Sequence, residues 1–235
     1  MSDAEDRIRQ LEKKFEEQIA NLAHQVGVLE DIHAVRTLHF KYGYYMDKCL
    51  YDQTVDLFSS DAELYFLNGV YRGRDGARRL YCDWFRNLFT QGQNGPVDGF
   101  LLDHLLLQDI VDVAPDRQTA RGRFRNIMQG GVHESREPIP GFPAQCWEGG
   151  IYENEYVRED GVWKIRVLNY NMLWQANYEE GWAHSGVHLP PLEKTYPDDP
   201  KGPDELLPAV PETWPKTRVV PFHYPHPVTG EKWKG

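Results

Sequence analysis

The sequence is poor in cysteine and in long apolar runs, and both shortages limit the class of protein. Only Cys49, Cys82 and Cys146 occur among 235 residues. This odd, widely spaced set does not fit the disulfide framework of a small secreted domain, so we expect reduced thiols in a cytoplasmic protein. No apolar run approaches the roughly 18–20 residues of a membrane-spanning helix. The charged N-terminus also lacks the apolar segment of a secretory signal.

Basic residues are in short supply as well, with 26 Lys and Arg against 36 Asp and Glu and a net charge of −10. Such a chain repels polyanions on average, so neither nucleic acid nor a membrane surface is an expected partner. The sequence contains no phosphate-cradling glycine loop, no dinucleotide fingerprint and no recognisable metal motif. We therefore expect no cofactor and no metal.

Aromatic residues, in contrast, are abundant, with 13 Tyr, 10 Phe and 7 Trp. Tyrosine combines a large apolar area with a hydroxyl group. The surplus favours either a small-molecule aromatic ligand or an aromatic-rich interface, and composition does not distinguish the two.

Residues 1–28 are predicted to form a helical arm. Apolar residues recur there at steps of three or four, with heptad character. The stripe consists of Ile8, Leu11, Phe15, Ile19, Leu22, Val26, Leu29 and Ile32. It is interrupted by Gln18, Gln25 and Gly27. Two interpretations remain open: the arm packs on a neighbouring subunit of a homo-oligomer, a dimer or trimer, or it lies on its own domain.

Residues 29–180 are predicted to form the folded core. Helical spacing continues to about residue 50, and a short helix is expected at 51–58. The Asn68-Gly69 pair predicts a hairpin, and Asp75-Gly76 opens a third helix. Four strand-like stretches follow, at 101–113, 119–129, 150–158 and 162–174. Helices followed by antiparallel strands are typical of the α+β class.

Residues 181–235 have a different composition. Eleven of the 16 prolines lie between Pro190 and Pro227, a density that excludes helix and central strand. Many apolar residues occur among them, which is unlike a solvated linker. We expect an extended proline-rich tail that wraps the core or a partner subunit.

Three short motifs within the core carry a family resemblance. Residues 41–52 predict a helix that ends in an aspartate before a short second helix. Residues 69–76 form a hairpin turn into the third helix, and residues 160–166 form a closing hairpin. In this order they resemble the SnoaL-like branch of the nuclear-transport-factor-two-like superfamily, over residues 28–178. The resemblance implies a cone-shaped α+β barrel, in which helices close the mouth of a bent antiparallel sheet.

Within this superfamily the chain looks most like the dehydratase group, which includes scytalone dehydratase and bile acid 7α-dehydratase. A γ-formaldehyde lyase of lignin-derived diarylpropanes shares the superfamily. The group pairs an aspartate on the first helix with a histidine at the start of a strand, and the matching positions here are Asp47 and His104. Two features differ. The tyrosine beside the aspartate of scytalone dehydratase is Met46 here, and its second catalytic histidine has no histidine counterpart in residues 121–128.

The chemistry of Asp47 and His104 fits an elimination. An aspartate on one ring nitrogen fixes the histidine tautomer and leaves the other nitrogen to take or give a proton. Loss of water or formaldehyde requires that a proton is removed from one atom and that the departure of the leaving oxygen is assisted at another. The resemblance therefore implies a cofactor-independent lyase acting on a hydroxylated aromatic or polycyclic substrate. The alternatives are a non-catalytic small-molecule-binding or assembly subunit, and an isomerase that uses Asp47 directly as base.

Polar and aromatic side chains around this pair are candidates for substrate binding. A phenol can hydrogen-bond a substrate oxygen or stabilise a developing oxyanion. Strand alternation places the even positions of 121–128 and 152–156 on the inner face, with the arginines of the first stretch outside. The candidates are Tyr42, Tyr45, Tyr65, Arg78, Phe124, Asn126 and Tyr152.

Overall fold

The protein is described by a computed structural model that covers residues 3–184 and 188–234. Residues 1–2 of the predicted arm, and 185–187 and 235 of the predicted tail, lie outside the described residues. The helical elements are α1 (Asp3–Asp47), α2 (Tyr51–Asp56), α3 (Gly73–Arg78), the π-helical turn η1 (Arg79–Phe85), α4 (Arg86–Thr90) and the short η2 (Trp182–His184). The strands are β1 (Phe58–Phe66), β2 (Gly69–Arg72), β3 (Phe100–Val113), β4 (Thr119–Val132), β5 (Gln145–Glu159), β6 (Val162–Asn177) and β7 (Glu205–Leu206).

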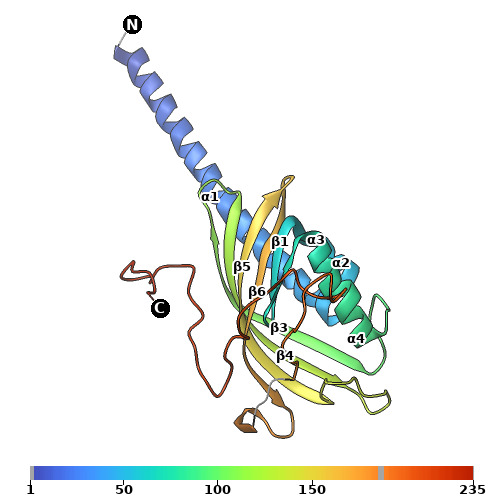
Figure 1. Cartoon of the computed structure of the whole chain (residues 1–235). Helices are drawn as coiled ribbons and strands as arrows, with labels where there is room; N and C mark the ends of the chain where they lie inside the picture. The colour runs from blue at the N-terminus through green and yellow to red at the C-terminus, as the bar shows by residue number, and fades with distance from the viewer. Residues whose placement is uncertain (1–2, 185–187, 235) are drawn as a thin grey trace.

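The described strands form one seven-stranded sheet in the order β3-β4-β5-β6-β1-β2-β7. Neighbouring strands are antiparallel except for β1 and β6, which are parallel. The long strands twist and bend around the second half of α1 and the shorter helices (Figure 1). This arrangement confirms the predicted α+β cone.

The strand register agrees with the predicted alternation. In β4, Phe124 and Asn126 are buried, whereas Arg121 and Arg125 are exposed. In β5, Tyr152 and the other even positions of 152–156 are buried. One face of each strand therefore packs on the helices, and the arginines lie on the outer face.

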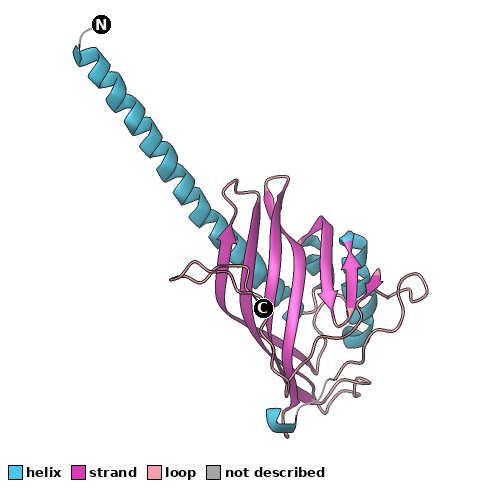
Figure 2. Ribbon diagram, turned by 60° about the vertical axis from the view of Figure 1, so that its left-hand side comes forward, coloured by secondary structure: helices cyan, strands magenta, loops and turns pink. Residues whose placement is uncertain are grey.

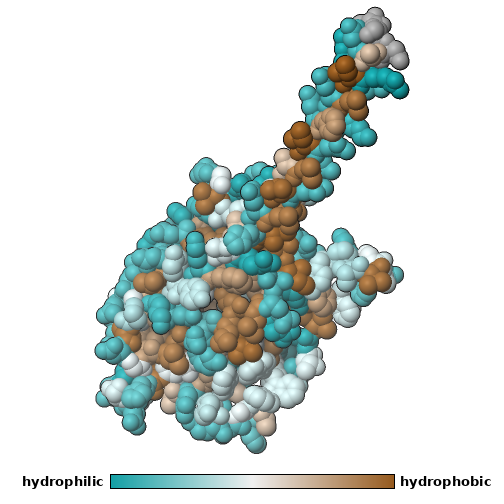
Figure 3. All heavy atoms as spheres, turned by 180° about the vertical axis from the view of Figure 1, so that it is seen from behind, coloured by the Kyte–Doolittle hydropathy of each residue, from teal (hydrophilic) through white to brown (hydrophobic). Residues whose placement is uncertain are grey.

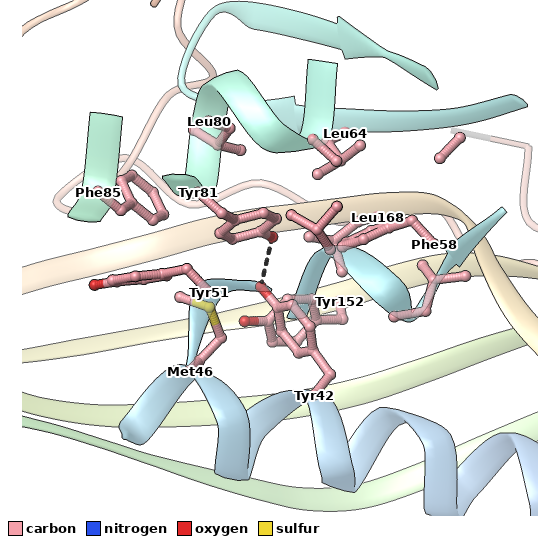
Figure 4. Packing of buried hydrophobic residues seen from close by; sticks show 14 of the residues in the cluster. Tyr42, Met46, Tyr51, Phe58, Leu64, Leu80, Tyr81, Phe85, Tyr152 and Leu168 are labelled. Carbon is pink, nitrogen blue, oxygen red and sulfur yellow. Dashed lines mark hydrogen bonds between the residues drawn. The ribbon is translucent and has the colours of Figure 1, made fainter. Parts of the chain in front are cut away.

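Aromatic side chains fill the space between the sheet and the helices. Figure 4 shows Tyr42 of α1 between Tyr81 and Tyr152, with a hydrogen bond between the hydroxyl groups of Tyr42 and Tyr81. The hydroxyl oxygens of Tyr42 and Tyr81 lie 3.1 Å apart. Deeper in the cone His39 is fully buried and stacks on Phe124, with ring centroids 3.9 Å apart. Burial lowers the pKa of His39 to about 3, so this histidine is a neutral core residue.

A buried carboxylate fastens α1 to the sheet. Asp31 accepts hydrogen bonds from Arg117 Nε at 2.5 Å, from Trp163 Nε1 at 3.1 Å and from Arg158. These partners come from the β3–β4 turn, β6 and β5. Burial opposes the charge of Asp31, but the hydrogen bonds from Arg117 and Trp163 and the charges of both arginines lower its pKa.

The first half of α1 projects from the domain as a straight arm (Figures 1 and 2). Residues 4–26 are all exposed. The apolar residues of the stripe from Ile8 to Leu29 are between 53% and 66% exposed. Figure 3 shows this stripe continuing from the arm onto the body of the molecule. The stripe therefore has no partner within the described chain.

The helix first meets the domain at Gly27. A Cβ atom there would lie 2.1 Å from Arg117 Nη1, so only glycine lets the guanidinium cross the helix at this point. The sequence indicated an interruption of the apolar stripe at Gly27. In the structure this glycine makes room for the Arg117 side chain, and α1 continues unbroken to Asp47.

The described part of the tail crosses its own domain. Strand β7 pairs with β2 at the edge of the sheet. Further on, the backbone amide of Trp214 donates to Leu173 O at 2.8 Å. On the outer face Arg123 Nη1 donates to Pro221 O at 3.0 Å, and His223 contacts Glu153. These contacts hold the tail against the sheet of the same chain.

Candidate active site

Asp47 and His104 meet where the end of α1 reaches β3. Asp47 Oδ1 lies 2.6 Å from His104 Nδ1 and also accepts the backbone amide of His104 at 2.9 Å. Both side chains are largely buried, with exposed fractions of 11% and 12%. One carboxylate oxygen thus fixes both the ring and the backbone of the histidine. Within the described residues Nε2 has no hydrogen-bond partner.

Local structure explains why these two groups are presented to each other. Helix α1 ends at Asp47, and Cys49 follows with a left-handed φ of 52°. The amide of Cys49 donates to Met46 O at 3.0 Å, which closes the helix end. In the first half of β3 the inner face carries Leu102, His104 and Leu106, whereas the odd positions from Leu101 to Leu107 point outward.

The His104 ring lines a largely aromatic cavity of about 110 Å³ between the sheet, α1, η1 and the start of the tail. Its lining residues are Tyr42, Met46, Tyr65, Phe66, Leu80, Tyr81, Phe85, Phe89, Leu102, His104, Met128, Phe142, Cys146, Glu148, Tyr152, Leu168, Tyr170, Gln175, His188 and Leu189.

A smaller second chamber of about 60 Å³ adjoins the first. The two share Phe66, Glu148, Tyr170, Gln175 and Leu189 as lining residues. The second chamber is closed on its other side by the tail segment 210–213. Of the described residues that line either chamber, none is Arg or Lys.

The cavity phenols are held in their protonated form. Burial raises the pKa of Tyr42 to about 12, although hydrogen bonds with Tyr81 and Tyr152 partly offset it. Burial likewise raises the pKa of Tyr81, Tyr152 and Tyr170 well above the ordinary value. These side chains are therefore hydrogen-bond donors at neutral pH.

Four of the proposed substrate-binding residues do not reach the cavity. Tyr45 is half-buried but lies about 100° around α1 from Met46, which faces the cavity. The Arg78 side chain is 58% exposed and lies 3.9 Å from Asp52. Phe124 is buried against His39, deeper in the core.

Asn126 also stands behind the cavity wall. Its Nδ2 donates to Tyr170 Oη at 3.2 Å, so it positions a residue of the lining without belonging to it. Of the seven candidates, Tyr42, Tyr65 and Tyr152 line the cavity.

Sequence reasoning missed several polar residues of the cavity. Glu148 and Gln175 lie on β5 and β6, and Gln175 Nε2 donates to Glu148 Oε2 at 2.5 Å. His188 follows in the tail, where its backbone amide donates to Gln175 Oε1 at 3.0 Å. The signal that could have revealed Glu148 is its alternation with Gly150 and Tyr152, because predicting β5 to begin at residue 150 left it out of the strand.

Within residues 3–184 and 188–234, no three His, Cys, Asp or Glu side chains gather as a metal site. The helices in the same ranges are all too short or too polar to cross a bilayer.

A bent sheet closed by helices over an aromatic cavity defines the chain as a cone-shaped α+β protein. The family model described as a SnoaL-like domain matches residues 27–169. This match spans more than half of the chain, and the protein belongs to the SnoaL-like family. A search of curated proteins gave no match.

Solved structures with the same fold include two kinds of bacterial protein. LinA has a TM-score of 0.52 and 19% identity, covering 72% of this chain and 99% of its own. A hexachlorocyclohexane dehydrochlorinase, LinA-type3 from Novosphingobium barchaimii, has a TM-score of 0.50 and 20% identity, with coverages of 70% and 97%. A protein provisionally described as a scytalone dehydratase, from Novosphingobium aromaticivorans, has a TM-score of 0.51 and 18% identity, with coverages of 71% and 96%. At these identities the likeness establishes the fold.

Proposed function

We propose that the protein is a cofactor-independent lyase that eliminates water or formaldehyde from a hydroxylated aromatic substrate. The observation that carries the proposal is the contact of 2.6 Å between Asp47 Oδ1 and His104 Nδ1 beside an aromatic cavity. The names of the similar structures, a dehydrochlorinase and a provisional dehydratase, both describe eliminations and support the same reaction class.

The proposed mechanism uses the two ring nitrogens of His104 for different tasks. Nδ1 donates to Asp47, which fixes the tautomer and stabilises the imidazolium that forms. Nε2 takes a proton from the substrate as general base and releases it before the next turnover. Tyr42 and Tyr152 hold substrate oxygens by donating from their phenols. Tyr65 contributes its ring to the cavity wall, because its hydroxyl donates to Glu63 Oε2 at 3.1 Å. Such a proton transfer requires no metal or organic cofactor.

The two chambers support a substrate with two rings. Each chamber has a largely aromatic or aliphatic wall, and they meet beside Glu148 and Tyr170. Because no Arg or Lys lines them in the described part of the chain, a carboxylate or phosphate on the substrate would lack a counter-ion. An uncharged, hydroxylated diarylpropane of the lignin-derived kind meets both conditions.

The same geometry disfavours the alternatives. An isomerase would need the Asp47 carboxylate aimed at the substrate, but Asp47 lines a groove between α1 and β3 outside the main cavity. A binding subunit could have an apolar cavity without a histidine held by a carboxylate. Neither alternative explains why Asp47 Oδ1 contacts both the backbone amide and the ring Nδ1 of His104.

The test is a mass-spectrometric screen of hydroxylated diarylpropanes and sterols with the purified protein. We expect a product lighter by one water, by one formaldehyde or by both. Matched diarylpropanes without hydroxyl groups are the control and should remain unchanged. If every hydroxylated compound is recovered intact, the proposed function is wrong.

We further propose that the arm packs on a second copy of the chain. Its apolar residues are spaced as in a coiled coil, and residues 4–26 extend for about 35 Å beyond the domain. An exposed stripe of this length is stabilised by burial against a matching helix or sheet face. On β3 the outward Leu101 and Leu105 are also exposed, at 52% and 39%.

Deleting residues 1–25 is expected to lower the number of subunits in the assembly, because it removes most of the stripe. Light scattering coupled to size-exclusion chromatography measures the change. Lys14→Gln alters only the polar face of the arm and should leave the assembly intact. An unaltered subunit count after the deletion would contradict the proposal.

A further inference from the structure

Glu148 is a partly buried acid whose described hydrogen-bond partners are neutral side chains. It lies on β5, lines both chambers, and is bonded to the neutral amide of Gln175. Burial raises its pKa, and the hydrogen bonds from Gln175 and Tyr170 and the charge of His104 only partly offset the effect. These effects shift the balance at Glu148 toward the protonated carboxyl. An apolar site of this kind can keep a carboxylic acid neutral so that it donates a proton.

The register of three strands sets Glu148 opposite His104. His104 of β3 pairs with Met128 of β4, which pairs with Glu148 of β5. Two strand spacings separate the backbones of His104 and Glu148 by about 10 Å. All three side chains line the same cavity on the concave face of the sheet. A substrate carbon chain between them would meet the histidine on one side and the acid on the other.

From this juxtaposition we infer that Glu148 is the general acid that protonates the departing hydroxyl group, with His104 as the base across the cavity. The inference rests on the proposed lyase function and deepens it. His104 Nε2 takes the proton from a C–H bond, and the electron pair of that bond forms the new C=C bond. The C–O bond breaks, and its oxygen takes the proton of Glu148 and leaves as water. A proton then passes from His104 to Glu148 through solvent, which restores both groups.

Loss of formaldehyde together with water uses the same pair. His104 then takes the O–H proton of a hydroxymethyl group, the C–C bond breaks to release formaldehyde, and its electrons form the C=C bond. The hydroxyl on the neighbouring carbon again leaves with the proton of Glu148. The products are one alkene, one formaldehyde and one water, so atoms and charge balance.

The pH dependence of this step depends on few other groups. The described titratable side chains that share the cavity with Glu148 are His104 on β3, Cys146 on its own strand, Tyr170 on β6, His188 in the tail, and Tyr42, Tyr65, Tyr81 and Tyr152. The pKa of Cys146 is raised to about 12, and that of His188 is lowered by burial. Neither gains charge at neutral pH.

The decisive variant is Glu148→Gln. Its amide oxygen can still accept the hydrogen bond from Gln175, but the side chain has no acidic proton to transfer. The probes are a 1,2-diarylpropane-1,3-diol and its analogue with fluoride in place of the 1-hydroxyl. We expect turnover of the diol to fall about 100-fold or more, and turnover of the fluoride to change less than about threefold. Fluoride leaves without a proton, so it bypasses the acid. A residue with a purely structural role would affect both substrates equally.

Two comparisons complete the test. Glu155→Gln, on the outer face of the same strand, should leave both rates unchanged. Infrared spectra of the substrate-free protein at pH 7 should show a protonated carboxyl band that Glu148→Gln removes. Equal loss of rate on both substrates, an unchanged rate on the diol, or no such band would overturn the inference while leaving the lyase in place. If the wild-type protein converts neither substrate, the lyase and the inference fall together.

Discussion

Replacing His104 by Ala is expected to reduce turnover of the diarylpropane by about 10²- to 10⁴-fold, the range for loss of a positioned proton-transfer group. Among the described residues that line the cavity, His104 is the only histidine with one ring nitrogen bonded to a carboxylate and the other left free. Asp47→Asn should cause a loss of similar order. An amide donates to Nδ1 as readily as it accepts, so the proton can move to Nε2, where it blocks the base.

Steady-state kinetics with a fixed substrate measure both effects, and far-UV circular dichroism checks that the variants fold. His33→Ala is the matched control, because His33 is an exposed histidine on the same helix as Asp47. It should turn over at the wild-type rate. Wild-type rates for His104→Ala in a folded protein would discard the mechanism.

Replacing Asp31 by Ala is expected to lower the free energy of unfolding by about 3 kcal/mol, near the lower end of the range for breaking a buried ion pair. The carboxylate holds Arg117, Arg158 and the Trp163 indole together, and its side chain is 5% exposed. The two arginines retain access to water, with 32% and 25% of their side chains exposed, which limits the loss. Urea denaturation measures the change.

The pH dependence of Asp31→Asn gives an independent check. The pKa of Asp31 is lower in the folded protein than its ordinary value of 3.8. Its contribution to stability is therefore fully present above that value and is lost as the pH falls below it. The stability difference between wild type and Asp31→Asn should be constant at neutral pH and shrink below about pH 4. Asp56→Asn, at an exposed position, should stay within about 0.5 kcal/mol of wild type.

Much of the fold follows from local sequence signals. The spacing in α1, the Asn68-Gly69 turn and the alternation in β4 each depend on neighbouring residues alone. They predicted the helices, the hairpin and the inner face of the strands. Local signals do not report where the second half of a helix will meet a sheet, so the contact of Gly27 with Arg117 could not be predicted.

The candidate site was predicted less completely. Asp47 and His104 came from a family resemblance, and 57 residues of chain separate two groups that lie 2.6 Å apart. Arg78 and Tyr45 do not line the cavity, because proximity in sequence to a hairpin or a helix end does not fix the direction of a side chain. Phe124 was correctly placed on the inner face, but that face extends beyond the cavity into the core.

Glu148 was missed for a specific reason. Gly149 and Gly150 look like a break between elements. In the structure both glycines lie inside β5, which begins before them at Gln145, and the strand register shifts there because β6 has one extra residue opposite them. Trp174 and Tyr170 approach the strand closely at these glycines. Glycine in a strand interior often marks such a close approach.

The continuity of α1 has a mechanical consequence. The carboxylate at Asp47 and the projecting turns belong to one continuous helix, which the contacts at Gly27 and Asp31 attach to the sheet. About 30 Å of unbroken helix separates Gly27 from Asp47. A neighbour that steadies the far end would also fix the angle at which the carboxylate meets the imidazole. Subunit assembly and proton transfer would then be coupled through a single helix.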